Sequence, residues 1–124
     1  MTQEDKQLLL KDLCARLPYG VIYHRNDGAN IRLNSIDFER GNLNYTDNVE
    51  EREIKPYLRP MSSMTEEESS EFALLQTDFY VDGILYPIAA TNMVKWLNAH
   101  HFDYCELIEK GLALEAPEWM YKNE

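Results

Sequence analysis

Two prolines that stand four residues apart, Pro56 and Pro60, constrain the middle of this chain most strongly. Each proline fixes its own backbone and disfavours a helical residue before it, so the segment Lys55–Pro60 must be extended. A helix can begin only after this segment. Thr65 and Glu68 form the capping-box pattern that starts one, and we expect it to run to about Leu75 or Gln76.

Helices are also predicted near both ends of the chain. Thr2 with Asp5 resembles a weak capping box, and Pro18 ends the helix that follows. Its apolar stripe consists of Leu9, Leu10, Leu13, Cys14 and Leu17. A second helix is expected from Ala89 to His101. A short final helix is expected to be capped by Asp103, to continue to Lys110 and to close at Gly111.

Strand signals lie between these helices. Val21 to about Phe38 is predicted to form a β-hairpin around the turn Asn26-Asp27-Gly28, and Leu43–Thr46 is a third short run. Residues 39–53 are compatible with both strand and loop. Phe79–Val81 is expected to pair with Ile84–Tyr86 across Asp82-Gly83. This order predicts one α+β domain over residues 1–124, with a small antiparallel sheet of about three to five strands packed against about three to four helices.

The charge balance restricts the possible partners. The 124 residues carry 12 Lys and Arg against 22 Asp and Glu, a net charge of −10, and the cations are spread along the sequence. Direct binding to nucleic acid or to an anionic membrane is therefore disfavoured, whereas a basic protein partner is compatible with the charge. The first 17 residues lack the apolar core of a signal peptide, and no apolar run approaches the roughly 20 residues of a membrane-spanning helix. A cytoplasmic location is expected.

The segment His100-His101-Phe102-Asp103-Tyr104-Cys105 contains several possible metal ligands. Adjacent helical residues point about 100 degrees apart, so the two histidines are poorly placed to share an ion. Asp103 is better explained as a helix cap, and no metal or other cofactor is predicted. Cys14 and Cys105 are expected to be free, largely buried and inert thiols. No catalytic set emerges, so an enzyme is not the favoured interpretation.

Two apolar features are candidate interaction surfaces. The first is Pro56, Tyr57, Leu58, Arg59 and Pro60, and the second is the pair Trp119 and Tyr121 near the C-terminus. The extended segment is either a rigid crossing that pins the sheet to the next helix or a docking strip for a protein partner. The aromatic pair is either a core anchor or an exposed patch. Both interpretations stay open for each feature.

Two longer stretches, Ile54–Glu68 and Trp96–Pro117, resemble an uncharacterised family of small proteins from gut Bacteroidales genomes. That family is associated with prophage-like and other mobile regions. The resemblance implies a bacterial cytoplasmic setting and a phage-linked or accessory role, and it supplies no catalytic residues. The chain departs from the family pattern at Cys105, where arginine is expected, and at Trp119, where a small residue is expected.

Three functional hypotheses follow. The favoured one is a non-enzymatic interaction or accessory module that contacts a protein partner or a second copy of itself. One alternative is an acidic mimic of nucleic acid that inhibits a DNA-binding protein, for which the net charge of −10 is the motive. The other is a small enzyme with a histidine and carboxylate site near residues 100–105.

Overall fold

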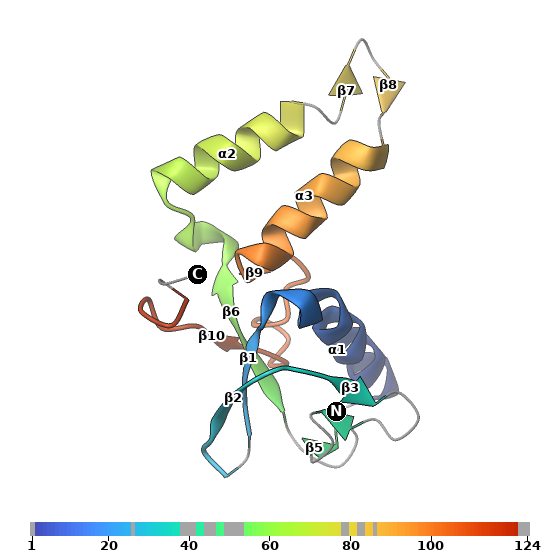
Figure 1. The fold of residues 1–124 in the computed structure, drawn as a ribbon, viewed down its shortest axis with the longest axis vertical. Helices are drawn as coiled ribbons and strands as arrows, with labels where there is room; N and C mark the ends of the chain where they lie inside the picture. The colour runs from blue at the N-terminus through green and yellow to red at the C-terminus, as the bar shows by residue number, and fades with distance from the viewer. Residues whose placement is uncertain are drawn as a thin grey trace.

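The computed structural model describes residues 2–25, 27–37, 42–43, 47–48, 54–77, 80–81, 84–85 and 87–121. The described elements confirm the predicted α+β class (Figure 1). The helices are α1 (Gln3–Arg16), α2 (Glu66–Thr77) and α3 (Pro87–Ala99), with 3₁₀ turns η1 (Leu17–Tyr19) and η2 (Met61–Ser63). The strands are β1 (Ile22–His24), β2 (Asn30–Arg32), β3 (Ile36–Asp37), β4 (Asn42–Leu43), β5 (Asp47–Asn48), β6 (Lys55–Pro60), β7 (Tyr80–Val81), β8 (Ile84–Leu85), β9 (Phe102–Asp103) and β10 (Leu114–Glu115).

The main sheet has the strand order β10-β6-β1-β2, and β9 also pairs with β6. Strands β1 and β2 form the predicted antiparallel hairpin, with Tyr23 opposite Ile31. The second strand is shorter than expected, because β3 instead pairs with β4, which in turn pairs with β5 in a separate small sheet. Phe38, the predicted strand end, lies outside the described residues, as do most of the residues between 39 and 53.

Strand β6, which contains both prolines, lies at the centre of the main sheet and is paired on both edges. It is antiparallel to β1 and parallel to β9 and β10, so the sheet is mixed rather than purely antiparallel. The amide of Arg59 donates to the carbonyl of His101, and the carbonyl of Leu58 accepts from the amide of Ala116, both at 2.8 Å. The carbonyl of Leu58 and the amide of Arg59 belong to one trans peptide group and point in opposite directions, so β9 and β10 lie on opposite sides of β6.

Helix α1 begins as its sequence predicts, and its predicted apolar stripe is buried in part, at Leu9 and Leu13. The Thr2 hydroxyl accepts from the amide of Asp5 at 3.0 Å, and the Asp5 carboxylate accepts from the amide of Thr2 at 3.3 Å. Leu9 and Leu13 are completely buried in the core between α1 and the sheet. The core also includes Val21, Tyr23, Leu33, Ile54, Leu58, Leu107, Leu112 and Ala113. The apolar stripe of α1 therefore fixes the helix against the strands.

A buried ion pair joins α1 to the C-terminal half of the chain. Arg16 is fully buried and donates to Asp12 at 2.7 Å and to the carbonyl of Phe102, in β9, also at 2.7 Å. Its guanidinium carbon lies 5.2 Å from the centre of the Tyr104 ring. Burial raises the pKa of Asp12, and the hydrogen bonds from Arg16 oppose that shift.

Helices α2 and α3 lie side by side and are linked through the β7–β8 pair (Figure 1). This pair confirms the predicted pairing at Tyr80–Val81 and Ile84–Leu85, while Phe79 and Tyr86 lie outside the described residues. The Thr65 capping box is present at the start of α2, which continues to Thr77. Helix α3 begins at Pro87, two residues earlier than expected, because proline suits the first turn of a helix. No helix in the described part of the chain is long and apolar enough to cross a membrane.

The predicted final helix is wrong. The carboxylate of Asp103 accepts from the amides of Leu107 and Ile108 at 2.9 and 3.0 Å, so Asp103 caps the turns that follow it. The residues that follow form turns rather than a helix, and Gly111 ends them with the expected positive φ of 74°. Glu106 has a left-handed φ of 59°, which interrupts a right-handed helix at its first turn.

Candidate binding pocket

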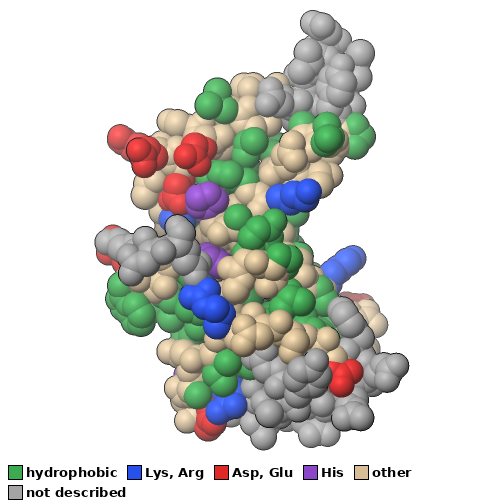
Figure 2. Space-filling model, in the orientation of Figure 1, with side chains coloured by type: hydrophobic (Ala, Val, Ile, Leu, Met, Phe, Trp, Pro, Cys, Tyr) green, Lys and Arg blue, Asp and Glu red, His purple; other side chains and the backbone are tan. Residues whose placement is uncertain are grey.

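A pocket of about 520 Å³ lies where the end of β6, the first turns of α2 and the C-terminal segment meet. Five of the side chains that line it are glutamates: Glu67, Glu68, Glu71, Glu115 and Glu118. One arginine, Arg59, and one histidine, His100, also line it. Figure 2 shows acidic side chains gathered over the α2 end of this face, beside a histidine. The pocket is therefore strongly acidic.

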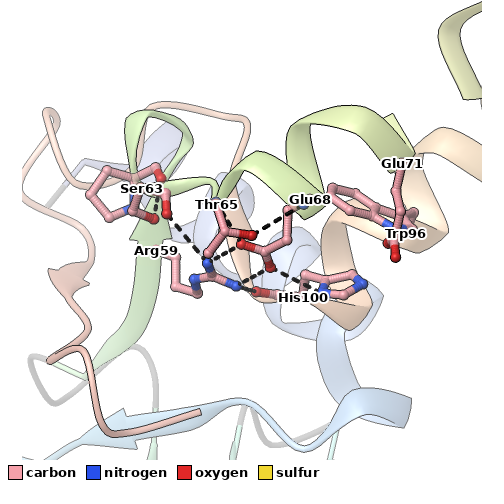
Figure 3. Close-up of polar contacts among 8 residues, drawn as sticks. Arg59, Ser63, Thr65, Glu68, Glu71, Trp96 and His100 are labelled. Carbon is pink, nitrogen blue, oxygen red and sulfur yellow. Dashed lines mark hydrogen bonds and ion pairs between the residues drawn. The ribbon is translucent and has the colours of Figure 1, made fainter. Parts of the chain in front are cut away.

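The floor of the pocket is built around one bidentate ion pair. The Arg59 guanidinium donates to both carboxylate oxygens of Glu68, at 2.6 and 2.7 Å (Figure 3). Glu68 also accepts from the amide of Thr65 at 3.0 Å, so one carboxylate completes the capping box of α2 and binds Arg59 of β6. The hydrogen bonds from Arg59 are the main reason that the pKa of Glu68 falls to about 2.

Arg59 is held on several sides. Its guanidinium carbon lies 4.2 Å from the centre of the Phe102 ring. It also donates to the carbonyl of His100 at 3.4 Å. Each contact engages the same flat cation, which leaves little of its charge for another anion. Among the described residues that line the pocket, the one arginine therefore balances Glu68 and does not neutralise the other four glutamates.

Aromatic side chains support the α2 wall. The indole N–H of Trp96 donates to Glu71 at 3.1 Å, which fixes that carboxylate in place (Figure 3). The Trp96 ring packs 4.3 Å from the His100 ring and 5.4 Å from Phe72, measured between ring centres. His100 Nδ1 lies 3.4 Å from Glu68 Oε2. Glu68 and Glu71 are thus held against a packed aromatic layer.

The opposite wall is the segment Ala116–Tyr121, called the strap below. The amide of Ala116 binds the carbonyl of Leu58 at 2.8 Å. At the other end, the Tyr121 hydroxyl donates to the carbonyl of Tyr57 at 2.8 Å and accepts from the amide of Ile22 at 3.0 Å. The Tyr121 ring stacks on His101, with 3.7 Å between ring centres.

The structure separates the candidate interaction residues into three groups. Arg59, Pro60 and Tyr121 line the pocket. Pro56 and Leu58 are buried, and the hydroxyl of half-buried Tyr57 binds Asn30 of β2 at 3.1 Å. Trp119 is 69% exposed on the strap, outside the residues that line the pocket. The proline segment therefore forms a central strand, which agrees with the structural interpretation of it as a rigid crossing.

Sequence reasoning missed the glutamates and His100 as members of one pocket. Glu68 carried a detectable signal, its capping box with Thr65, but nothing local indicated that Arg59 would reach it. Glu115 and Glu118 become pocket residues only because β10 pairs with β6, at Leu114 opposite Tyr57. Such pairing has no signature at the level of neighbouring residues.

The segment from His100 to Cys105 divides between two environments. His100 lines the pocket, whereas His101 is 1% exposed and lies against Tyr121. Within the described ranges, no three histidine, cysteine or acidic side chains are grouped so that they could hold a metal ion. Cys14 and Cys105 are half-buried free thiols, and burial raises the pKa of both, which disfavours the reactive thiolate.

Comparison with protein-family models, with curated proteins and with solved structures gives no significant match.

Proposed function

We propose that this protein is a non-enzymatic binding module that holds a basic segment of a protein partner in the acidic pocket. The observation that carries the proposal is the excess of glutamates among the described residues that line the pocket, five against one arginine that is already bound to Glu68. Carboxylates gathered in a concave site reinforce one another's field and attract a cationic ligand. The net charge of −10 would add long-range attraction to such a partner.

Rigid presentation of the carboxylates also supports this function. Glu68 is fixed by Arg59 and by the cap of α2, and Glu71 is fixed by Trp96. A binding site with fixed polar groups loses less side-chain entropy when its ligand arrives. The remaining acids, such as Glu67 and Glu118, are exposed and can reach the side chains of a bound peptide.

The test is the affinity of the protein for a fluorescent peptide of alternating arginine and glycine, measured by anisotropy. We expect binding that weakens as salt rises, because the attraction is electrostatic. Neutralising two pocket acids, Glu67→Gln with Glu118→Gln, should weaken binding about three- to tenfold, or about 0.7–1.4 kcal/mol. The control pair is Glu4→Gln with Glu109→Gln, which removes two exposed charges outside the pocket lining.

Equal weakening by both pairs would show that only the net charge matters, and it would reject the pocket as the site. A neutral peptide of the same length should not bind. If the acidic protein instead displaces duplex DNA from a basic DNA-binding protein, and both pairs of substitutions reduce that displacement equally, the nucleic-acid mimic becomes the better proposal.

A second candidate function rests on the contact between His100 Nδ1 and Glu68 Oε2, at 3.4 Å inside the same pocket. A histidine oriented by a carboxylate is the arrangement of a general base. Glu68 is already committed to Arg59, which makes it a weaker partner for the imidazole. Hydrolysis of an activated ester at equal rates by the wild type and by His100→Gln would remove this candidate.

We further propose a cytoplasmic setting and an accessory role of the kind that the family resemblance implies. The two free cysteines support the setting, because thiols persist unpaired in reducing compartments.

A further inference from the structure

We infer that the strap is the movable wall of the pocket, that the Tyr121 hydroxyl holds it closed, and that closure strengthens the binding of the basic segment. This inference rests on the proposed function for its binding step. The closing device itself follows from the positions at which the strap is attached.

The strap is attached to both edges of β6. Its first residue, Ala116, binds the carbonyl of Leu58, on the edge where β10 lies. Its last, Tyr121, binds the carbonyl of Tyr57. Because the peptide groups of Tyr57 and Leu58 face opposite edges, the strap crosses the strand between its two attachments.

Tyr121 is inserted where the ladder between β1 and β6 stops. The last pairs in that ladder are His24 with Lys55 and Tyr23 with Pro56, so the next position would place Ile22 opposite Tyr57. The Tyr121 hydroxyl occupies that position, since it accepts from the amide of Ile22 and donates to the carbonyl of Tyr57. One side-chain oxygen therefore satisfies two backbone groups that would otherwise lack a strand partner there.

Two residues in the middle of the strap, Glu118 and Trp119, are exposed, whereas Pro117 and Met120 are half-buried. The amide of Met120 binds the carbonyl of Pro117 at 3.0 Å, which folds the strap on itself. Trp119, the largest side chain in the strap, is 69% exposed. The strap is hydrogen-bonded to the strands at its two ends, and the Tyr121 end combines a hydroxyl contact with the ring stack on His101.

Release of Tyr121 would change the pocket directly. Pro117, Glu118 and Tyr121 all line it, so an open strap removes one wall together with the Glu118 carboxylate. A ligand that binds the closed form better must shift the strap toward closure by the same free energy that closure adds to its affinity. The basic peptide and the Tyr121 hydroxyl should thus reinforce each other.

The experiment uses Trp119 as a reporter on the strap, in the 124-residue protein that carries Trp96→Phe, so that Trp119 is the sole tryptophan in it. Tyr121→Phe removes the hydroxyl and keeps the ring. Tyr104→Phe is the matched control, because its half-buried hydroxyl also makes a 2.8 Å bond, to Asn98, away from the strap. Trp119 fluorescence anisotropy and the affinity for the arginine–glycine peptide are measured for each variant.

We expect Tyr121→Phe to lower the anisotropy of Trp119 and to weaken peptide binding about three- to tenfold, and saturating peptide to restore the anisotropy. Tyr104→Phe should change neither quantity. Unchanged anisotropy in Tyr121→Phe would overturn the inference, and so would lower anisotropy with unchanged affinity. If Tyr121→Phe lowers the anisotropy but the protein with Tyr121 intact does not bind the peptide either, the result would support the closing device and reject the proposed function.

A second measurement avoids the Trp96 substitution, which alters the aromatic layer behind Glu71. Hydrogen exchange at the amide of Ile22 should accelerate in Tyr121→Phe and stay unchanged in Tyr104→Phe, because only the first variant removes the acceptor of that amide. Equal exchange rates in the two variants would contradict the inference.

Discussion

Glu68 performs several structural tasks with one carboxylate. It accepts from the amide of Thr65, which completes the cap of α2, and it forms the bidentate pair with Arg59 of β6. One of its oxygens also faces His100. Loss of its charge should therefore affect the stability of the fold as well as the shape of the pocket.

The pH dependence of stability should report on Glu68. Its pKa falls from 4.5 to about 2 on folding, so its carboxylate stabilises the fold above about pH 4.5 and ceases to do so as the pH falls toward 2. Its side chain is 15% exposed, which reduces the effect, and we expect a contribution of about 1–3 kcal/mol. Urea unfolding at pH 7, 5 and 3 should show a smaller acid loss for Glu68→Gln than for the wild type. The exposed neighbour Glu67→Gln is the control, and parallel curves for all three proteins would contradict the assignment.

Among the elements, the starts of α1 and α2 were predictable because both residues of a capping box lie within a segment of four residues. Thr2 with Asp5 and Thr65 with Glu68 both form as their spacing indicates. The hairpin of β1 and β2 was predictable for the same reason, since its turn and its strands are contiguous.

The elements that were missed depend on distant or exceptional geometry. The predicted final helix is absent because Glu106 has a left-handed backbone, which no residue pattern in the sequence indicates. Strands β9 and β10 are short, and they are strands because each pairs with one edge of β6. The candidate site follows from this pairing, so its Arg59, Pro60 and Tyr121 could be suspected from the sequence while its acidic wall could not.

The two N-caps should differ in their cost of removal. Thr65→Ala and Thr2→Ala each delete a hydroxyl that accepts from a helix amide, at 3.1 and 3.0 Å. The Thr2 cap is local, whereas the Thr65 cap also positions Glu68 for Arg59. We expect a loss of about 0.5–1 kcal/mol for Thr2→Ala and about 1–2 kcal/mol for Thr65→Ala, measured by chemical denaturation. Equal losses would show that the ion pair does not depend on the cap.

At the scale of the whole molecule, Arg16 joins the N-terminal helix to the C-terminal half of the chain. It binds Asp12 within α1 and the carbonyl of Phe102, 86 residues away. Arg16→Met should destabilise the protein by about 3–5 kcal/mol at pH 7, because Asp12 would remain buried without its cation.

The double variant Arg16→Met with Asp12→Leu should recover part of that stability, since it removes both charges. Differential scanning calorimetry of the three proteins checks this expectation. A double variant less stable than Arg16→Met would mean that Asp12 stabilises the fold without its partner.

The position of β6 in the sheet has a consequence for how the chain folds during synthesis. Its partners come from both sides of it in the sequence, with Tyr23 opposite Pro56 and Leu114 opposite Tyr57, and the bond from Ile22 to Tyr121 spans 99 residues. Contacts of such long range form slowly. While the nascent chain lacks β10, the edge of β6 that β10 covers is bare and can pair with a strand of another chain. Translation of β10 is therefore the step that allows this edge to be covered and ends its exposure to aggregation.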